Sequence, residues 1–236
     1  MSEPAVPPVA VRTRAGVQQR GEDTRLRILR TALQVFATEG YEGASTRALA
    51  QRAHVNLPAL QYYFGNKEGL YRAVVDHISE TVESHITPVT EKIRTDLATG
   101  GASRRQLLDH LCRMIEAFAA MVTDQSDPDW EYRALFFARA EIEPQAALDA
   151  LHQRVMRQIV EPCAVLIGHL IGRPADAEET LLRTVALIGQ VSVFCHRKAQ
   201  QVLGWHQVDE ARTCAIQALM REHTRAIFRR VKGAVR

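Results

Sequence analysis

The chain has 236 residues, of which 46% are hydrophobic and 24% charged, and its formal net charge is +3. This composition is ordinary for a globular protein with a sizeable core, and the length allows one or two domains. We expect no membrane span, because the sequence has no run of 18 uninterrupted apolar residues. We also expect no export, because the N-terminus lacks the apolar core of a signal peptide.

The four cysteines are scattered along the chain and form no Cys-x-x-Cys pair: Cys112, Cys163, Cys195 and Cys214. This pattern argues against a zinc site or a disulfide framework and favours the reducing cytoplasm. We therefore expect a cytoplasmic protein without a metal or a cofactor.

The positive charge gathers at the front of the chain. Residues 1–72 hold ten Arg and Lys against six Asp and Glu, whereas the remaining residues hold twenty against twenty-one. A cationic front end on a near-neutral body is typical of a protein that binds a polyanion. Residues 1–21, rich in Pro with few large apolar groups, predict a disordered and mildly basic tail.

A helical pattern begins at Thr24, with Asp23 placed to cap its start and Gly40 to end it. Large apolar residues recur there at steps of three and four: Leu26, Leu29, Leu33 and Phe36. Residues 45–67 then predict two short helices joined by a tight turn at His54-Val55, with Ser45 capping the first and Asn56 the second. We assign residues 22–68 to a helix-turn-helix head that binds DNA, followed by a long helix from Lys67.

The second short helix has side chains that a packed core does not require. Its inward position is Leu60, whereas tyrosines and a glutamine are left facing outward beside basic residues. Such groups suit phosphates and base edges.

The rest of the chain, residues 69–236, predicts a larger helical domain, so the fold class is all-α. Breaks at Pro88, at Gly100-Gly101 and at later Pro and Gly residues separate helices, which we expect over residues 103–123, 130–142, 145–171, 176–203 and 208–232.

Two late segments have unusual apolar patterns. Residues 181–194 are apolar around most of a helix, which predicts burial on several sides. The last helix has an apolar stripe rich in small residues: Val208, Ala211, Ala215, Leu219, Ala226 and Ile227. The stripe suggests either a homodimer interface or packing within one protomer. A two-fold dimer would bind a pseudo-palindromic operator in double-stranded DNA.

The run from Gly40-Tyr41-Glu42-Gly43 through Ser45-Thr46-Arg47 and Tyr62-Tyr63-Phe64-Gly65-Asn66-Lys67 resembles the N-terminal signature of the TetR (tetracycline-repressor) family over about 50 residues. Ala186 through Gly204-Trp205 is similar to the C-terminal domain of the CecR-type branch. The resemblance implies a transcriptional regulator, in the first place a repressor that a small-molecule effector releases from DNA. A transcriptional activator of the same family is the alternative.

The resemblance also implies contact roles. Thr46 would hold a phosphate, and Arg47 would reach a guanine edge or a phosphate. Gln61 would pair with adenine, Tyr62 or Tyr63 would donate to a phosphate, and Lys67 would contact the backbone. The full expected DNA-binding set is Ser45, Thr46, Arg47, Asn56, Leu57, Pro58, Ala59, Gln61, Tyr62, Tyr63 and Lys67. His54, Leu57 and Gln61 depart from the family pattern, so the operator sequence does not carry over.

The family's second domain binds a small molecule among its middle helices, and the fourth helix transmits the signal by a pendulum-like motion. Aromatic and polar residues of those helices are the candidate lining, with plain core packing as the alternative. The expected ligand-binding set is Trp130, Phe136, Phe137, Arg139, His152, Met156, His169 and Phe194.

Two readings from other classes compete: an enzyme, or a helical protein that binds a small molecule without binding DNA. Cys195 and His196 are adjacent on a helix and point about 100° apart, so they do not form a nucleophile–base pair. His77 and His85 are eight residues apart, whereas a metal site would favour a spacing of four. We therefore expect no enzyme.

Overall fold

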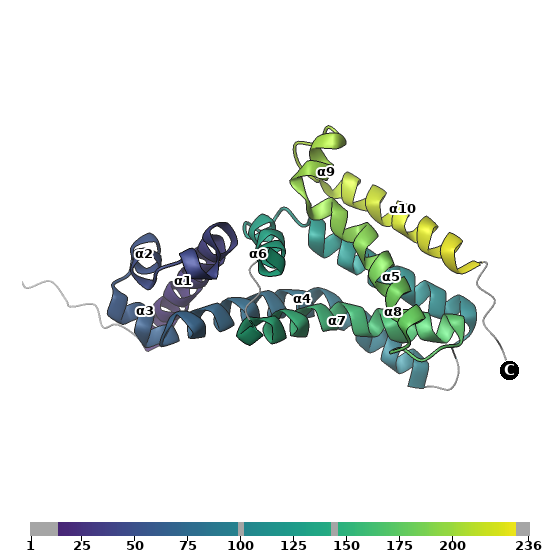
Figure 1. Cartoon of the computed structure of the whole chain (residues 1–236), viewed down its shortest axis with the longest axis horizontal. Helices are drawn as coiled ribbons and strands as arrows, with labels where there is room; N and C mark the ends of the chain where they lie inside the picture. Colours follow the sequence, from purple (N-terminus) through teal and green to yellow (C-terminus); the bar gives the residue numbers. More distant parts are fainter. Residues whose placement is uncertain (1–13, 99–101, 143–145, 230–236) are drawn as a thin grey trace, which may run out of the picture.

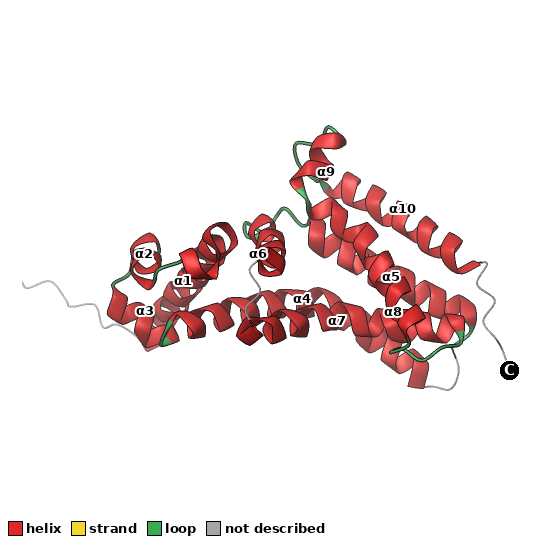
Figure 2. Ribbon diagram, in the orientation of Figure 1, coloured by secondary structure: helices red, strands yellow, loops and turns green. Residues whose placement is uncertain are grey.

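The protein is described by a computed structural model that covers residues 14–98, 102–142 and 146–229. These residues contain ten α-helices and one short 3₁₀ helix joined by loops, with no strand among them (Figure 2). No helix of this described part is long and apolar enough to cross a membrane.

The N-terminal head consists of α1 (Arg14–Gly43), α2 (Thr46–Arg52) and α3 (Leu57–Phe64), which pack on the start of α4 (Lys67–Ala98). α4 then runs on as a rod from the head along the body (Figure 1). The head and the rod share one core, because α1 buries Leu33 and Phe36 where α4 buries Tyr71 and Val74.

The body contains α5 (Arg104–Thr123), α6 (Trp130–Ile142), α7 (Ala146–Ile171), α8 (Glu178–Ser192), η1 (Val193–Cys195), α9 (Arg197–Val202) and α10 (Glu210–Arg229). α5 lies at its centre and contacts α4, α7, α8 and α10. α6 lies between the head and the rest of the body and packs on α1 (Figure 1). The helix that contacts the head therefore belongs in sequence to the C-terminal domain.

The first helix is longer than the sequence pattern predicts. It begins at Arg14, so the predicted tail is wrong for residues 14–21, and Asp23 lies inside the helix instead of capping it. A Cβ at Gly21 would lie 3.7 Å from the hydroxyl of Tyr63, so this extension packs beside α3. Residues 1–13 lie outside the described part. Gly40, with φ of 77°, ends the regular helix as predicted.

Two other breaks also differ from the prediction. Pro88 does not end a helix, since α4 continues through it and buries Ile86 and Ile93 on either side. This packing compensates for the hydrogen bond that proline cannot make. In contrast, the single helix predicted over residues 176–203 is divided by η1 and by His196, whose backbone is extended.

α8 is not buried on several sides, contrary to the sequence prediction. One face is buried against α5 and α7, with Leu187, Ile188 and Val191 in the core. On the other face, Leu182 and Val185 remain 65% and 61% exposed. The apolar circumference of α8 thus supplies both a core face and an exposed apolar face.

Candidate functional site

The helix-turn-helix is held by local hydrogen bonds that its sequence provides. Ser45 Oγ accepts a hydrogen bond of 3.1 Å from the N–H of Ala48, which caps α2. At the other end of α2, Arg27 Nε of α1 donates to the carbonyl of Ala53 at 3.0 Å. Leu49 and Ala50 are buried against the head's core, so the orientation of α2 is fixed at both ends and on one face.

The turn between α2 and α3 contains a strained backbone conformation at His54. His54 has φ of 52° and is the only non-glycine residue with positive φ in the described part of the chain. Such a backbone costs a residue with a Cβ more than it costs glycine. Packing of Ala53 and Leu60 on either side maintains the turn despite this cost.

α3 is short and presents most of its surface outward. Asn56 Oδ1 accepts a hydrogen bond of 2.8 Å from the N–H of Ala59, and Pro58 occupies the first turn, where its missing N–H is not needed. Leu60 is fully buried and anchors the helix. Gly65, with φ of 73°, ends it.

The structure places the expected DNA contacts on one end of the head with different degrees of exposure. Tyr62 is 84% exposed, and the hydroxyl-bearing ring of Tyr63 lies beside it, with centroids 5.3 Å apart. The exposed members of the expected set are Ser45, Arg47, Asn56, Pro58, Gln61 and Tyr62. The half-buried members are Thr46, Leu57, Ala59, Tyr63 and Lys67.

Lys67 is half-buried because its ammonium group lies 4.4 Å from the centre of the Tyr41 ring. A cation over an aromatic face is held in position while its charge still projects a field toward solvent. We use the name reading face for the two caps, the exposed arginine, the glutamine, the two tyrosines and the lysine: Ser45, Arg47, Asn56, Gln61, Tyr62, Tyr63 and Lys67.

A cavity of about 270 Å³ lies in the body, bounded by α4, α5, α6, α7 and the segment from Ser192 to His196. This volume is close to the lower end of the range typical of small-molecule sites, about 300–1,000 Å³. Most of its lining is apolar: Ile78, Val82, Phe118, Met121, Val122, Trp130, Ala134, Phe137, Ala138, Val155, Met156 and Ile159. The other lining residues are Thr81, Arg133, Ser192, Cys195 and His196.

Three of the expected ligand-binding residues, Trp130, Phe137 and Met156, line this cavity. Phe136 points instead into the core and packs on Tyr71, with ring centres 5.0 Å apart. Arg139 donates to the carbonyl of Thr38 on α1 at 2.7 Å.

The remaining three expected residues do not contribute to the lining. His169 is exposed near the end of α7, and Phe194 is half-buried outside the cavity. The side chain of His152 lies outside the described part. The lining residues of α4 and α5 were missed because their helical spacing is also that of ordinary core residues.

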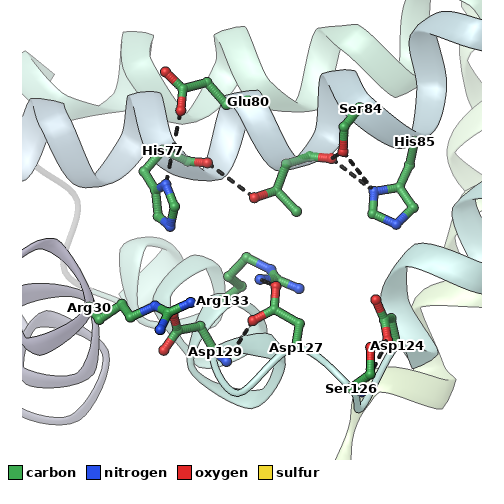
Figure 3. A network of polar contacts seen from close by, with 11 residues as sticks. Arg30, His77, Glu80, Ser84, His85, Asp124, Ser126, Asp127, Asp129 and Arg133 are labelled. Carbon is green, nitrogen blue, oxygen red and sulfur yellow. Dashed lines mark hydrogen bonds and ion pairs between the residues drawn. The ribbon is translucent and has the colours of Figure 1, made fainter. Parts of the chain in front are cut away.

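A polar network connects the cavity with the head (Figure 3). Asp129, at the start of α6 and 3% exposed, pairs with Arg30 of α1 at 3.1 Å. The N–H of Asp129 donates to Asp127 Oδ1 at 2.8 Å, and Asp127 also pairs with Arg133 of the cavity lining. The segment from Asp127 to Arg133 therefore contacts both the cavity and the first helix of the head.

Burial determines the charge state of several groups near this network. Desolvation lowers the pKa of His77, against the opposing effect of Glu80, so this ring is neutral at pH 7. Burial raises the pKa of Cys195 to about 11, so the thiol stays protonated and is a poor nucleophile. Among the described residues, no group of three or more His, Cys, Asp or Glu could hold a metal ion.

Two family models match the chain. The model described as "Bacterial regulatory proteins, tetR family" matches residues 28–74, and the model for the C-terminal domain of the HTH-type transcriptional dual regulator CecR matches residues 107–230. The chain is 28% identical over 196 residues to the dual regulator CecR of Shigella flexneri, covering 82% of this chain and 86% of that protein. It is 28% identical over 184 residues to the transcriptional activator FasR of Mycolicibacterium smegmatis, covering 76% and 74%.

Solved structures share the fold at lower identity. A TetR-like regulator from Rhodococcus sp. RHA1 superposes with a TM-score of 0.59 at 19% identity, covering 86% of this chain and 95% of that one. FadR from Bacillus subtilis, in complex with stearoyl-CoA, gives a TM-score of 0.56 at 15% identity, covering 89% and 99%.

Proposed function

Because the chain belongs to the TetR family of bacterial regulators and has a CecR-type C-terminal domain, it is a DNA-binding transcriptional regulator, and we propose that it is a repressor released by a small molecule. The observation that supports DNA binding through α3 is the reading face. Tyr62, Gln61 and Arg47 are exposed there. Their exposure does not stabilise the folded monomer, whereas it suits contacts with phosphates and base edges.

The proposed operator-binding form is a homodimer built on α8 and α10. The exposed face of α8 lies next to α10, where His223 Nδ1 is 3.3 Å from Gln190 Oε1. Large apolar side chains remain exposed on both helices: Leu181, Leu182, Val185, Leu219 and Ile227. Most of the small-residue stripe, including Ala215 and Ala226, is exposed as well. Such a patch is typical of an interface, and a two-fold axis would let two heads bind two half-sites.

The proposed effector site is the cavity, and α6 is suited to couple it to DNA. One face of α6 contributes Trp130, Arg133 and Phe137 to the cavity. Its other contacts reach α1 through Asp129–Arg30 and through the hydrogen bond of Arg139 to Thr38. A ligand that moves α6 would therefore displace the head, which is the differential contact that allosteric coupling requires.

A mobility-shift assay with the DNA that flanks the protein's own gene tests the proposed function. We expect a shift that weakens steeply as salt rises, because each phosphate neutralised by the protein releases counterions. Absence of a salt-sensitive shift at micromolar protein would contradict operator binding. A promoter–reporter fusion then separates the two signs of regulation, since activation, as the name of FasR states for that relative, would raise expression.

The pair between the buried Asp129 and the partly exposed Arg30 should carry much of the coupling. In a Trp205→Phe background, adding operator DNA should change the fluorescence of Trp130, which follows Asp129 and lines the cavity. The additional change Asp129→Asn should reduce this response by more than half while preserving the shape of the side chain. Glu39→Gln is the matched control, because Glu39 pairs with Arg52 at 2.5 Å within the head. An unchanged response in Asp129→Asn, or an equal loss in the control, would refute this role.

A further inference from the structure

The lining of the cavity contains a positively charged side chain but no negatively charged one. None of its residues is an aspartate or a glutamate, and the protonated thiol of Cys195 adds no negative charge. The hydroxyls of Thr81 and Ser192 donate to the carbonyls of His77 and Ile188 in their own helices. The lining therefore presents one permanent charge, the guanidinium of Arg133, to a bound molecule, together with the exposed ring of His196.

Arg133 is well placed to bind an anion. Its side chain is only 13% exposed, so water screens its charge weakly. Within the described residues, its one hydrogen-bond acceptor is Asp127, which contacts Nη1. Since a guanidinium has five N–H donors, other donors remain for a second acceptor, and a planar carboxylate matches their geometry.

Asp127 is not among the lining residues and is itself ionised. Desolvation acts to raise the pKa of Asp127, but the N–H of Asp129 and the Arg133 guanidinium outweigh it and hold this pKa below its ordinary value. A ligand carboxylate on Arg133 would therefore share the guanidinium with a second negative charge. The competition would weaken the Arg133–Asp127 pair, next to the turn that holds Arg30 of the head (Figure 3).

Resting on the effector role proposed above, we infer that the cavity selects an apolar molecule with one carboxylate or similarly charged acid group. The acid group binds Arg133, and the apolar part contacts Trp130, Phe137 and Met156. A cationic molecule would meet the guanidinium without a compensating acid in the lining, and a neutral one would forgo the charge-assisted hydrogen bonds.

Three probes that differ only in their terminal group test this selectivity: 4-phenylbutyrate, 4-phenylbutanol and 4-phenylbutylamine. Isothermal titration calorimetry of the full chain should give a dissociation constant for the butyrate at least about tenfold lower than for the alcohol, with the amine weakest. Equal or tighter binding of the alcohol or the amine would overturn the inference. So would the absence of butyrate binding at millimolar concentration.

Two substitutions with opposite expected effects separate binding from folding. Arg133→Met keeps an unbranched apolar stem but removes the guanidinium, and it should abolish the preference for the butyrate over the alcohol. Asp127→Asn keeps the acceptor for the N–H of Asp129 but removes the competing charge, so it should bind the butyrate several-fold more tightly than the parent. General destabilisation cannot tighten binding. A preference that survives in Arg133→Met, or weaker butyrate binding in Asp127→Asn, would overturn the assignment of Arg133.

The mobility-shift assay keeps this inference distinct from the proposed function. If operator DNA binds but the probes show no acid preference, the inference about the cavity is wrong, while the proposed DNA-binding function is still supported. If the acid preference is present in calorimetry while no DNA is shifted, the cavity's selectivity holds and the proposed repressor fails.

Discussion

If the proposed homodimer on α8 and α10 is right, replacing Leu182 with glutamate is expected to convert it to a monomer and to abolish specific operator binding. Leu182 is 65% exposed in the protomer and lies on the apolar face of α8 with Val185. In a two-fold dimer each copy of this face meets the other, so a single substitution introduces two carboxylates into one interface. An unpaired buried charge costs several kcal/mol, which corresponds to an increase of about 100-fold or more in the dissociation constant.

Sedimentation velocity over a range of concentrations measures this change directly. The matched control is Val202→Glu, the same kind of apolar-to-acid change at an 88% exposed position of α9, and it should leave the dimer intact. The monomeric variant should keep its helical circular dichroism, because the buried face of α8 is untouched. A Leu182→Glu protein that sediments like the parent would show that the two copies do not meet on this face.

The parts of the fold that local signals determine could be predicted from the sequence. The caps Ser45 and Asn56 and the terminator Gly40 follow from what one residue does to its own backbone. These signals determine where the regular part of α1 ends and where α2 and α3 begin. The head and its outward-facing residues were therefore predictable. The all-α class followed from periodicity along the rest of the chain.

Features that depend on distant contacts could not be predicted in the same way. Pro88 is a helix breaker by its chemistry, and only the packing of α4 on α5 and α7 overrides it. The apolar circumference of α8 predicts burial, but the sequence does not say that one face stays exposed in the protomer.

The residues that line the cavity could not be predicted from the sequence for the same reason. Phe136 and Phe137 are neighbours with the same chemistry, yet one is buried against Tyr71 and the other lines the cavity. Arg133 gave no signal in the sequence, because its importance depends on the position of Asp127 and on the absence of acids around it. Residue type identifies candidates, and only the helix packing selects among them.

Replacing Arg47 with alanine is expected to weaken operator binding by about tenfold or more for each head, and so by about 100-fold for a dimer. Arg47 is exposed on α2 and makes no hydrogen bond or ion pair with any described residue, so its removal should leave the stability of the head unchanged. Fluorescence anisotropy with labelled operator measures the affinity, and thermal melting checks the fold. The control is Arg113→Ala, which removes another exposed arginine, from α5 in the body.

The salt dependence of the same variant decides which of its two predicted roles Arg47 performs. If Arg47 contacts a phosphate, the alanine variant should lose affinity for all DNA sequences equally, and the slope of log affinity against log salt should fall by about one for each head. If it reads a guanine edge, the slope should stay nearly constant, and discrimination at one base pair of each half-site should disappear. Wild-type affinity in the Arg47→Ala protein, with Arg113→Ala equally unaffected, would contradict both roles and would exclude this side of α2 from the DNA interface.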